Sequence, residues 1–156
     1  MVTNGPFEPQ FVEALRQMFE ERILFNRVLG IRITAFDPQR ARARIAMRED
    51  LIGHFLHRRL HGGVISATLD AMGGLAVMLA IGARHLQEPV EARLARFSKL
   101  GTIDLRVDYL RPATGPHFDA SAETIRLGSR VASTRMDMHD AEGRLVATGA
   151  AAYIVS

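Results

Sequence analysis

The sequence predicts an α+β fold in which a mostly antiparallel sheet of six strands wraps around one long apolar helix. The stretch from Gly62 to Ala83 contains Asp70 as its one charged side chain, which predicts a helix buried on all sides. Two short strand patterns precede this stretch and four longer ones follow it. No linker or low-complexity run divides the 156 residues, so we expect a single domain over 1–156.

One helix and two strands are expected before the apolar stretch. Residues 9–28 place apolar side chains on one helical face and charged ones opposite, which predicts an N-terminal amphipathic helix. Strands are predicted at 31–36 and 40–47. In the second strand arginine alternates with alanine or isoleucine, as expected when one face lies in water. The polar segment 49–60 is expected to be irregular.

The apolar stretch itself allows two interpretations. By length and apolarity, residues 62–83 could cross a membrane. The central acid, the glycines and the lack of a second such stretch favour a core helix instead, so no membrane partner is expected. A shorter amphipathic helix is predicted at 88–99. The remaining strands are predicted within 101–112 and at 117–127, 130–139 and 144–155.

Composition excludes several classes of function. The isoelectric point is about 10.1, but the formal net charge is only +3, because 19 of the 20 basic residues are Arg and one is Lys. No aromatic-rich basic module accompanies the charge, so no nucleic-acid partner is expected. The absence of cysteine excludes a disulfide, a thiolate zinc site and a cysteine nucleophile. The first ten residues lack a basic-then-apolar leader pattern, which predicts a cytoplasmic protein.

A glycine pair stands at the start of the predicted core helix, in the run His61-Gly62-Gly63. Glycines there leave backbone N–H groups accessible at the positive end of the helix dipole. Such groups can polarise a carbonyl or hold an oxyanion. The alternative interpretation is that the two glycines only form a turn.

Asp70 is the strongest candidate for a functional residue. A carboxylate with apolar neighbours all round is unfavourable unless it is paired or functional. Small residues at helical spacing around it, among them Gly73 and Gly74, clear a shallow face for a ligand or a second helix. The alternative is a structural Asp bonded to backbone donors or to an arginine such as Arg106.

The spacing of these two features predicts a shared site. Gly62 and Asp70 are eight residues apart, which is about 12 Å along a helix. A carbonyl bound at the Gly62 amide therefore cannot also lie within ~3.5 Å of the Asp70 carboxylate of the same helix. Two antiparallel helices in a two-fold dimer would supply both groups and form two equal sites.

These residues resemble the PaaI-type hotdog thioesterases, and within that family they look closest to the bacterial YigI type. The resemblance covers roughly residues 25–155. It is carried by His61-Gly62-Gly63, by Asp70, and by Asp104 with the run Tyr109-Leu110-Arg111-Pro112-Ala113. It implies a hotdog fold and hydrolysis of acyl-CoA, of medium to long chain, to a free acid and CoA. It also implies a homodimer, arranged as a dimer of dimers, and no cofactor, since coenzyme A is part of the substrate.

The resemblance also implies roles for individual residues. The Gly62 amide would polarise the thioester carbonyl, Asp70 would act as nucleophile or general base, and Thr102 would place the water. Among the catalytic residues the motif also includes His61. The implied substrate-binding residues are Gly63, Arg111, Gly128, Ser129 and Arg130.

Two positions depart from the family pattern. Phe55 stands where the family commonly has Asn or Gln six residues before the histidine, and we expect His54, or else His57, to take that role. Gly74 stands where a hydroxyl is common. The three histidines of 54–61 have spacings that would suit a metal, but the glycine pair breaks any helix there, so no metal is expected.

Two other functions remain open on the sequence. One is a dehydratase or hydratase of the same fold acting on acyl thioesters, although such enzymes pair a histidine with an acid across the dimer. The other is a non-catalytic acyl-CoA binding protein, which the missing Asn or Gln keeps in consideration.

Overall fold

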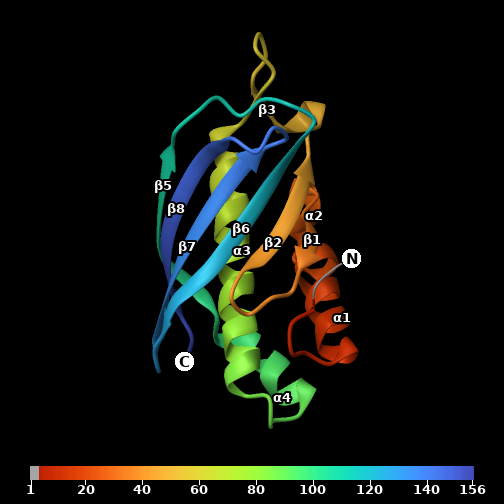
Figure 1. Ribbon diagram of the computed structural model, residues 1–156, viewed down its shortest axis with the longest axis vertical. Helices are drawn as coiled ribbons and strands as arrows, with labels where there is room; N and C mark the ends of the chain where they lie inside the picture. Colours follow the sequence, from red (N-terminus) through yellow and green to blue (C-terminus); the bar gives the residue numbers. More distant parts are fainter. Residues whose placement is uncertain (1–3) are drawn as a thin grey trace.

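The computed structural model describes residues 4–156 and confirms the α+β hotdog fold. Figure 1 shows one sheet curving around the long helix α3. The strand order is β1-β2-β6-β7-β8-β5, and every neighbouring pair is antiparallel. The strands are β1 (Arg32–Ala35), β2 (Ala41–Ala46), β5 (Gly101–Tyr109), β6 (His117–Leu127), β7 (Val131–Asp140) and β8 (Leu145–Ile154).

Helix α3 (Gly62–Arg84) is the core of the molecule. Its most apolar window has a mean hydropathy of 1.9, enough to cross a membrane, but 67% of that window is buried inside the fold. The helix packs against β6, β7, β8, β2 and β5. Its apolarity is therefore explained by the sheet that surrounds it, which supports the core-helix interpretation.

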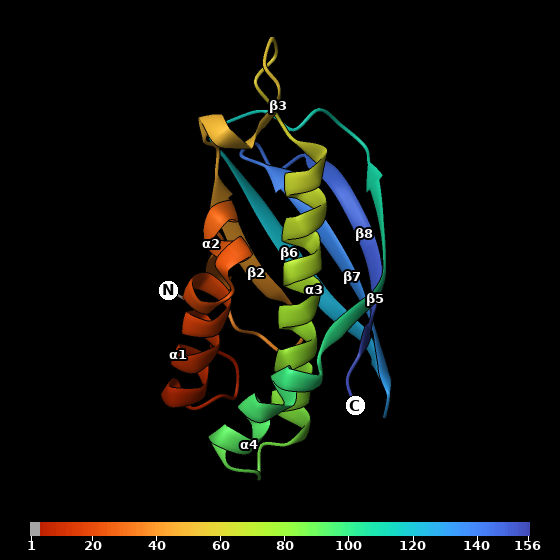
Figure 2. The same cartoon turned by 180° about the vertical axis from the view of Figure 1, so that it is seen from behind.

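The N-terminal helix is not continuous, so the prediction of one helix over 9–28 was wrong. Figure 2 shows α1 (Pro9–Gln17) and α2 (Leu24–Leu29) along one side of α3. A π-helical turn, Met18–Arg22, follows α1, and Ile23 is extended with φ −77° and ψ 100°. The break is stabilised because the Asn26 side chain donates to the freed Phe19 carbonyl at 2.9 Å. Periodicity alone does not reveal such a local side-chain bond.

The segment 49–60, expected to be irregular, contains a 3₁₀ turn, Glu49–Leu51, and a small hairpin of β3 (Ile52–His54) and β4 (Arg59–Leu60). Buried side chains of Leu51 and Leu60 anchor its base. Its tip extends beyond the end of α3 where that helix begins (Figure 1).

The predicted helix 88–99 is a short helix, α4 (Val90–Ala95), followed by a 3₁₀ turn, Arg96–Lys99. A buried arginine of α4 ties it to α1. The Arg93 guanidinium donates to Glu8 at 2.6 Å and lies 4.6 Å above the ring centroid of Phe11. α4 therefore packs beside α1 at the C-terminal end of α3 (Figure 2).

Candidate active site

Asp70 is held by two hydroxyl groups of the sheet. The Thr102 hydroxyl, on β5, donates to Oδ1 of Asp70 at 2.9 Å. The Tyr153 hydroxyl, on β8, lies 3.1 Å from the same oxygen and 2.8 Å from the Asp70 peptide oxygen. Thr102 and Tyr153 are register partners, so the pairing of β5 with β8 brings both groups to the same carboxylate.

No arginine neutralises this carboxylate. Among residues 4–156 no ion pair includes Asp70, and Arg106 is instead bonded to Asp108 at 3.2 Å. The two hydroxyl contacts both go to Oδ1, and no donor to Oδ2 is found in the described part of the chain. Asp70 is half-buried at the edge of a cavity. One carboxylate oxygen is thus oriented while the other is left open for chemistry.

Tyr153 was missed by the sequence analysis. It lies 83 residues from Asp70 in the chain, and the signal that could have indicated it is a tyrosine at an inward position among the alanines of the last strand. Burial, and then the Asp70 charge, raise the pKa of Tyr153 above its ordinary value. The phenol therefore stays protonated and donates a hydrogen bond beside the carboxylate at every physiological pH.

Gly73 and Gly74, which follow Asp70 in α3, differ in why glycine stands there. A Cβ at Gly73 would lie 2.1 Å from the Tyr153 hydroxyl, so only glycine leaves room for that group. At Gly74 a Cβ would meet Leu100 Cδ2 at 3.6 Å, an ordinary contact. Glycine is therefore sterically required at Gly73, whereas at Gly74 it only leaves open space.

That open space belongs to a cavity of about 280 Å³ beside α3. Asp70, Thr102 and Tyr153 form its polar end. Its walls are otherwise largely apolar and come from segments distant in sequence: Phe19, Ile23, Phe25, Phe97 and Leu100. A site that joins an oriented carboxylate to an apolar cavity suits a substrate with a reactive polar group and a hydrocarbon part.

The start of α3 presents one accessible backbone donor. Nδ1 of His61 accepts from the Gly63 N–H at 2.8 Å, so His61 caps the helix and occupies the second glycine amide. No acceptor for the Gly62 N–H is found within residues 4–156. The Tyr109 hydroxyl donates to the Gly62 carbonyl at 3.0 Å and so fixes the adjoining Gly62–Gly63 peptide. Gly62 is thus the amide that can bind a ligand oxygen.

The remaining predicted residues lie away from Asp70. His54 is exposed on β3 and stacks on His57, with ring centroids 4.8 Å apart, and it does not line the cavity. No cluster of three metal-ligating side chains is found in the described residues.

The two arginines expected at CoA lie at opposite ends of α3. Arg111, near the Gly62 end, donates to the Leu145 carbonyl at 2.8 Å. The turn Gly128, Ser129 and Arg130 lies near the other end, where Arg84 donates to the Leu127 carbonyl. A 23-residue helix is roughly 33 Å long. One chain therefore does not bring these arginines together.

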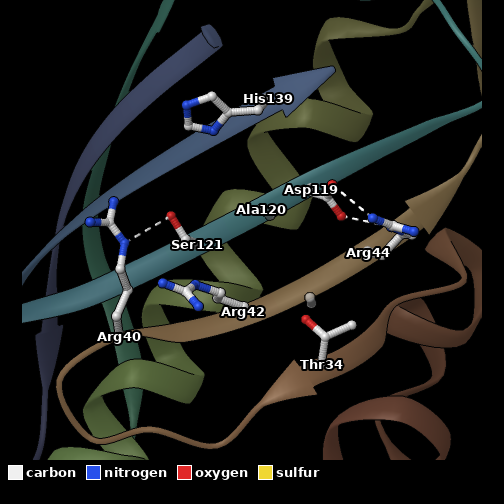
Figure 3. Close-up of a pocket in the computed structure, with 9 residues that line it drawn as sticks. Thr34, Arg40, Arg42, Arg44, Asp119, Ala120, Ser121 and His139 are labelled. Atoms are coloured by element: carbon white, nitrogen blue, oxygen red, sulfur yellow. Dashed lines mark hydrogen bonds and ion pairs between the residues drawn. The ribbon is translucent and has the colours of Figure 1, made fainter. Parts of the chain in front are cut away.

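A larger depression, of about 580 Å³, lies on the outer face of the sheet. Figure 3 shows Arg42 and Arg44 on β2 and Arg40 just before it, with α3 behind the sheet. Arg44 pairs with Asp119 at 2.7 Å, and Arg40 pairs with an acid of β7 at 3.1 Å. These cross-strand pairs confirm that one face of this strand is exposed, and they lie on the opposite side of the sheet from Asp70.

Comparison with known families agrees with this geometry. The model of the thioesterase superfamily matches residues 57–147, which include α3 and most of the sheet. The chain belongs to the thioesterase superfamily, and its class of reaction is hydrolysis of thioester bonds.

Individual relatives are similar over nearly the whole chain. The medium/long-chain acyl-CoA thioesterase YigI of Escherichia coli is 34% identical over 94% of each chain. A crystal structure of a Shewanella oneidensis protein related to the thioesterase superfamily has a TM-score of 0.89 and 34% identity, covering 97% of this chain and 99% of that one. A Haemophilus influenzae thioesterase shares the fold with a TM-score of 0.73 at 24% identity, covering 99% and 94%.

Proposed function

We propose that this protein hydrolyses medium- to long-chain acyl-CoA to a free acid and CoA, with Asp70 as the catalytic carboxylate. The observation that carries the proposal is the Asp70 carboxylate, oriented by two hydroxyls at the polar end of an apolar cavity. The similarity to YigI, a medium/long-chain acyl-CoA thioesterase, supports the same substrate class.

The geometry allows two routes for Asp70. As a general base, its carboxylate takes a proton from water, and the oxygen adds to the thioester carbon. As a nucleophile, it attacks that carbon itself and gives a mixed anhydride that water then hydrolyses. In either route the C–S bond breaks and the thiolate of CoA leaves and takes up a proton. Thr102 donates to Oδ1, and we assign the reaction in either route to Oδ2, for which no donor is found in residues 4–156.

The carbonyl oxygen needs a donor, and the Gly62 N–H is the available one. Gly62 of the same chain is about 12 Å along the helix from Asp70, so we assign it to the site of a second copy. The proposed active unit is therefore a homodimer, which can pair further into a dimer of dimers. In this arrangement Arg111 and Arg130 from different chains can approach the phosphates of one CoA, which arginine binds bidentately.

Asp70→Asn is the decisive variant. It keeps the size of the side chain but removes its charge and basicity, so kcat should fall at least ~100-fold. The loss of kcat is measured by thiol release from a panel of acyl-CoA substrates. Circular dichroism of the variant is the folding control.

Hydrolysis at wild-type rate by folded Asp70→Asn protein would remove Asp70 from the mechanism. If the wild type binds acyl-CoA but releases no thiol from any member of the panel, the protein is a binding protein and not an enzyme.

A further inference from the structure

The apolar part of the cavity takes no part in bond cleavage. It begins at Asp70 and continues past Gly74, four residues further along α3, or about 6 Å along the helix axis. Hydrocarbon surrounds Gly74, since a Cβ there would meet Leu100 at 3.6 Å and the rings of Phe19 and Tyr153 at 4.0 Å. A chain attached to a carbonyl at Asp70 therefore has an apolar path past Gly74.

Two aromatic rings from distant segments close this path. Phe19 comes from the π-helical turn and Phe97 from the 3₁₀ turn after α4. Their ring centroids are 5.8 Å apart at an interplanar angle of 71°, an edge-to-face contact. Phe19 is buried, and it faces Gly74 across the cavity. The rings form a wall opposite the helix.

The segments that carry the two rings are each anchored to their surroundings. The Asn26 side chain is buried and donates to the Phe19 carbonyl at 2.9 Å, which fixes the backbone that carries the first ring. Arg93, four residues before Phe97, is fully buried and is bonded to Glu8. The backbone that carries the wall is therefore anchored in the fold, as discrimination by size requires.

We propose that Phe19 and Gly74 determine which acyl-chain length the enzyme hydrolyses. Phe19 is the wall that faces Gly74, and the missing side chain of Gly74 leaves the gap through which the chain passes. The cavity of about 280 Å³ lies at the lower limit of ligand sites, which span about 300–1,000 Å³. A single methyl group is therefore a large change in the space left for the chain. This inference rests on the proposed function, because it takes an acyl chain as the occupant.

Gly74→Ala tests the gap. The added methyl makes only ordinary contacts, and Ala is favoured over Gly inside a helix, so the variant should fold. We expect kcat/KM to fall at least ~10-fold for the longest acyl-CoA that the wild type accepts, and by less than ~3-fold for the shortest.

Phe19→Leu tests the wall in the opposite direction. The smaller side chain enlarges the cavity opposite Gly74, so kcat/KM should rise at least ~10-fold for acyl chains two to four carbons longer than the wild-type optimum. Phe36→Leu is the matched control: Phe36 is equally buried but does not line the cavity. This control should lower thermal stability without moving the chain-length profile.

The outcomes separate this inference from the proposed function. Active variants whose chain-length profiles coincide with that of the wild type overturn the roles of Phe19 and Gly74 and leave the thioesterase activity intact. A shift of the profile in Phe36→Leu equal to that in Phe19→Leu also overturns them, because the effect is then not local. A wild type that hydrolyses no acyl-CoA of any length overturns the proposed function itself.

Discussion

At the scale of single residues, the site depends on how one carboxylate is oriented. Thr102 and Tyr153 both contact Oδ1 of Asp70, and Gly73 is the position that gives the Tyr153 hydroxyl its space. Thr102, Tyr153 and Gly73 are neither the nucleophile nor the general base of the proposed reaction. They hold Oδ1 of Asp70 in place at the edge of the cavity, so their loss should affect turnover more than binding.

Thr102→Val removes the hydroxyl and keeps the shape of the side chain. A hydrogen bond contributes about 1 kcal/mol, so kcat should fall roughly fivefold or more with little change in KM. Tyr153→Phe should act in the same direction. Steady-state kinetics on one acyl-CoA measure both variants.

Rescue and control variants separate positioning from general damage to the sheet. Thr102→Ser restores a hydroxyl and should recover most of the lost turnover. Thr34→Val, on the outer face of the sheet, should have no effect. An equal loss of kcat in Thr34→Val and Thr102→Val would argue against a positioning role.

At the scale of elements, α1 and α4 pack together, and the turns that follow them carry Phe19 and Phe97 of the cavity wall. Arg93 of α4 is buried, and Nε and Nη1 of its guanidinium have no partner within residues 4–156. Its bond to Glu8 is therefore its one ion pair in the described chain.

The hydrogen bond from Arg93 holds the pKa of Glu8 below its ordinary value. A carboxylate whose pKa is lowered by folding stabilises the protein above its unfolded pKa, and the stabilisation is lost as pH falls through the lower folded value.

Glu8→Gln should consequently destabilise the protein at pH 7 and much less at pH 3, because the wild-type carboxylate is neutralised in acid. Urea unfolding of both proteins across this range measures the difference in midpoint. Glu13→Gln, an exposed acid on the same helix, is the control and should show little difference at any pH. A Glu8→Gln difference that is constant with pH would show that the ion pair does not contribute through charge.

At the scale of the whole molecule, one chain holds the groups that we propose for catalysis and CoA binding far apart. The Gly62 amide and the Asp70 carboxylate belong to different turns of α3, and the arginines proposed for CoA lie at its two ends. Strand β5 is the last strand of the sheet order, and it carries the exposed apolar side chains of Ile103 and Tyr109. A second copy packed against this side in antiparallel orientation would bring the separated groups together.

Mixed dimers test this arrangement. Asp70→Asn and Gly62→Pro, which removes the amide donor, should each be inactive alone. If each site takes Gly62 from one chain and Asp70 from the other, a mixed dimer contains one intact site and should recover about half of the wild-type activity per dimer. Thiol release from co-expressed, separately tagged chains measures the recovery.

Circular dichroism and sizing of Gly62→Pro come first, since proline is tolerated in the first turn of a helix but can disturb its start. With both variants folded, verified mixed dimers without activity would show that each chain contains a complete site.

The sequence by itself determined the six strands and the core helix, and it indicated the two residues that we propose as central to the site. Alternation of polar and apolar residues along each strand reflects local burial, so all six strands of the sheet were found to within a few residues. Asp70 stood out because a charged side chain is unfavourable within an apolar helix, and Gly62 because a glycine pair leaves an accessible amide at the helix start. Both features are visible from neighbouring residues alone. The break at Ile23 was not visible, because a buried Asn26 side chain decides it.

Only the tertiary structure decided what surrounds the carboxylate. Tyr153 reaches Asp70 because β5 and β8 pair in one particular register, and a shift by one residue would turn its side chain to the other face. Phe19 and Phe97 meet because α1 and α4 pack together at the end of α3. Such contacts join residues tens of positions apart, and their energies depend on packing that no local pattern encodes. For this reason the sequence indicated the reaction, whereas the fold defined the space available to the substrate.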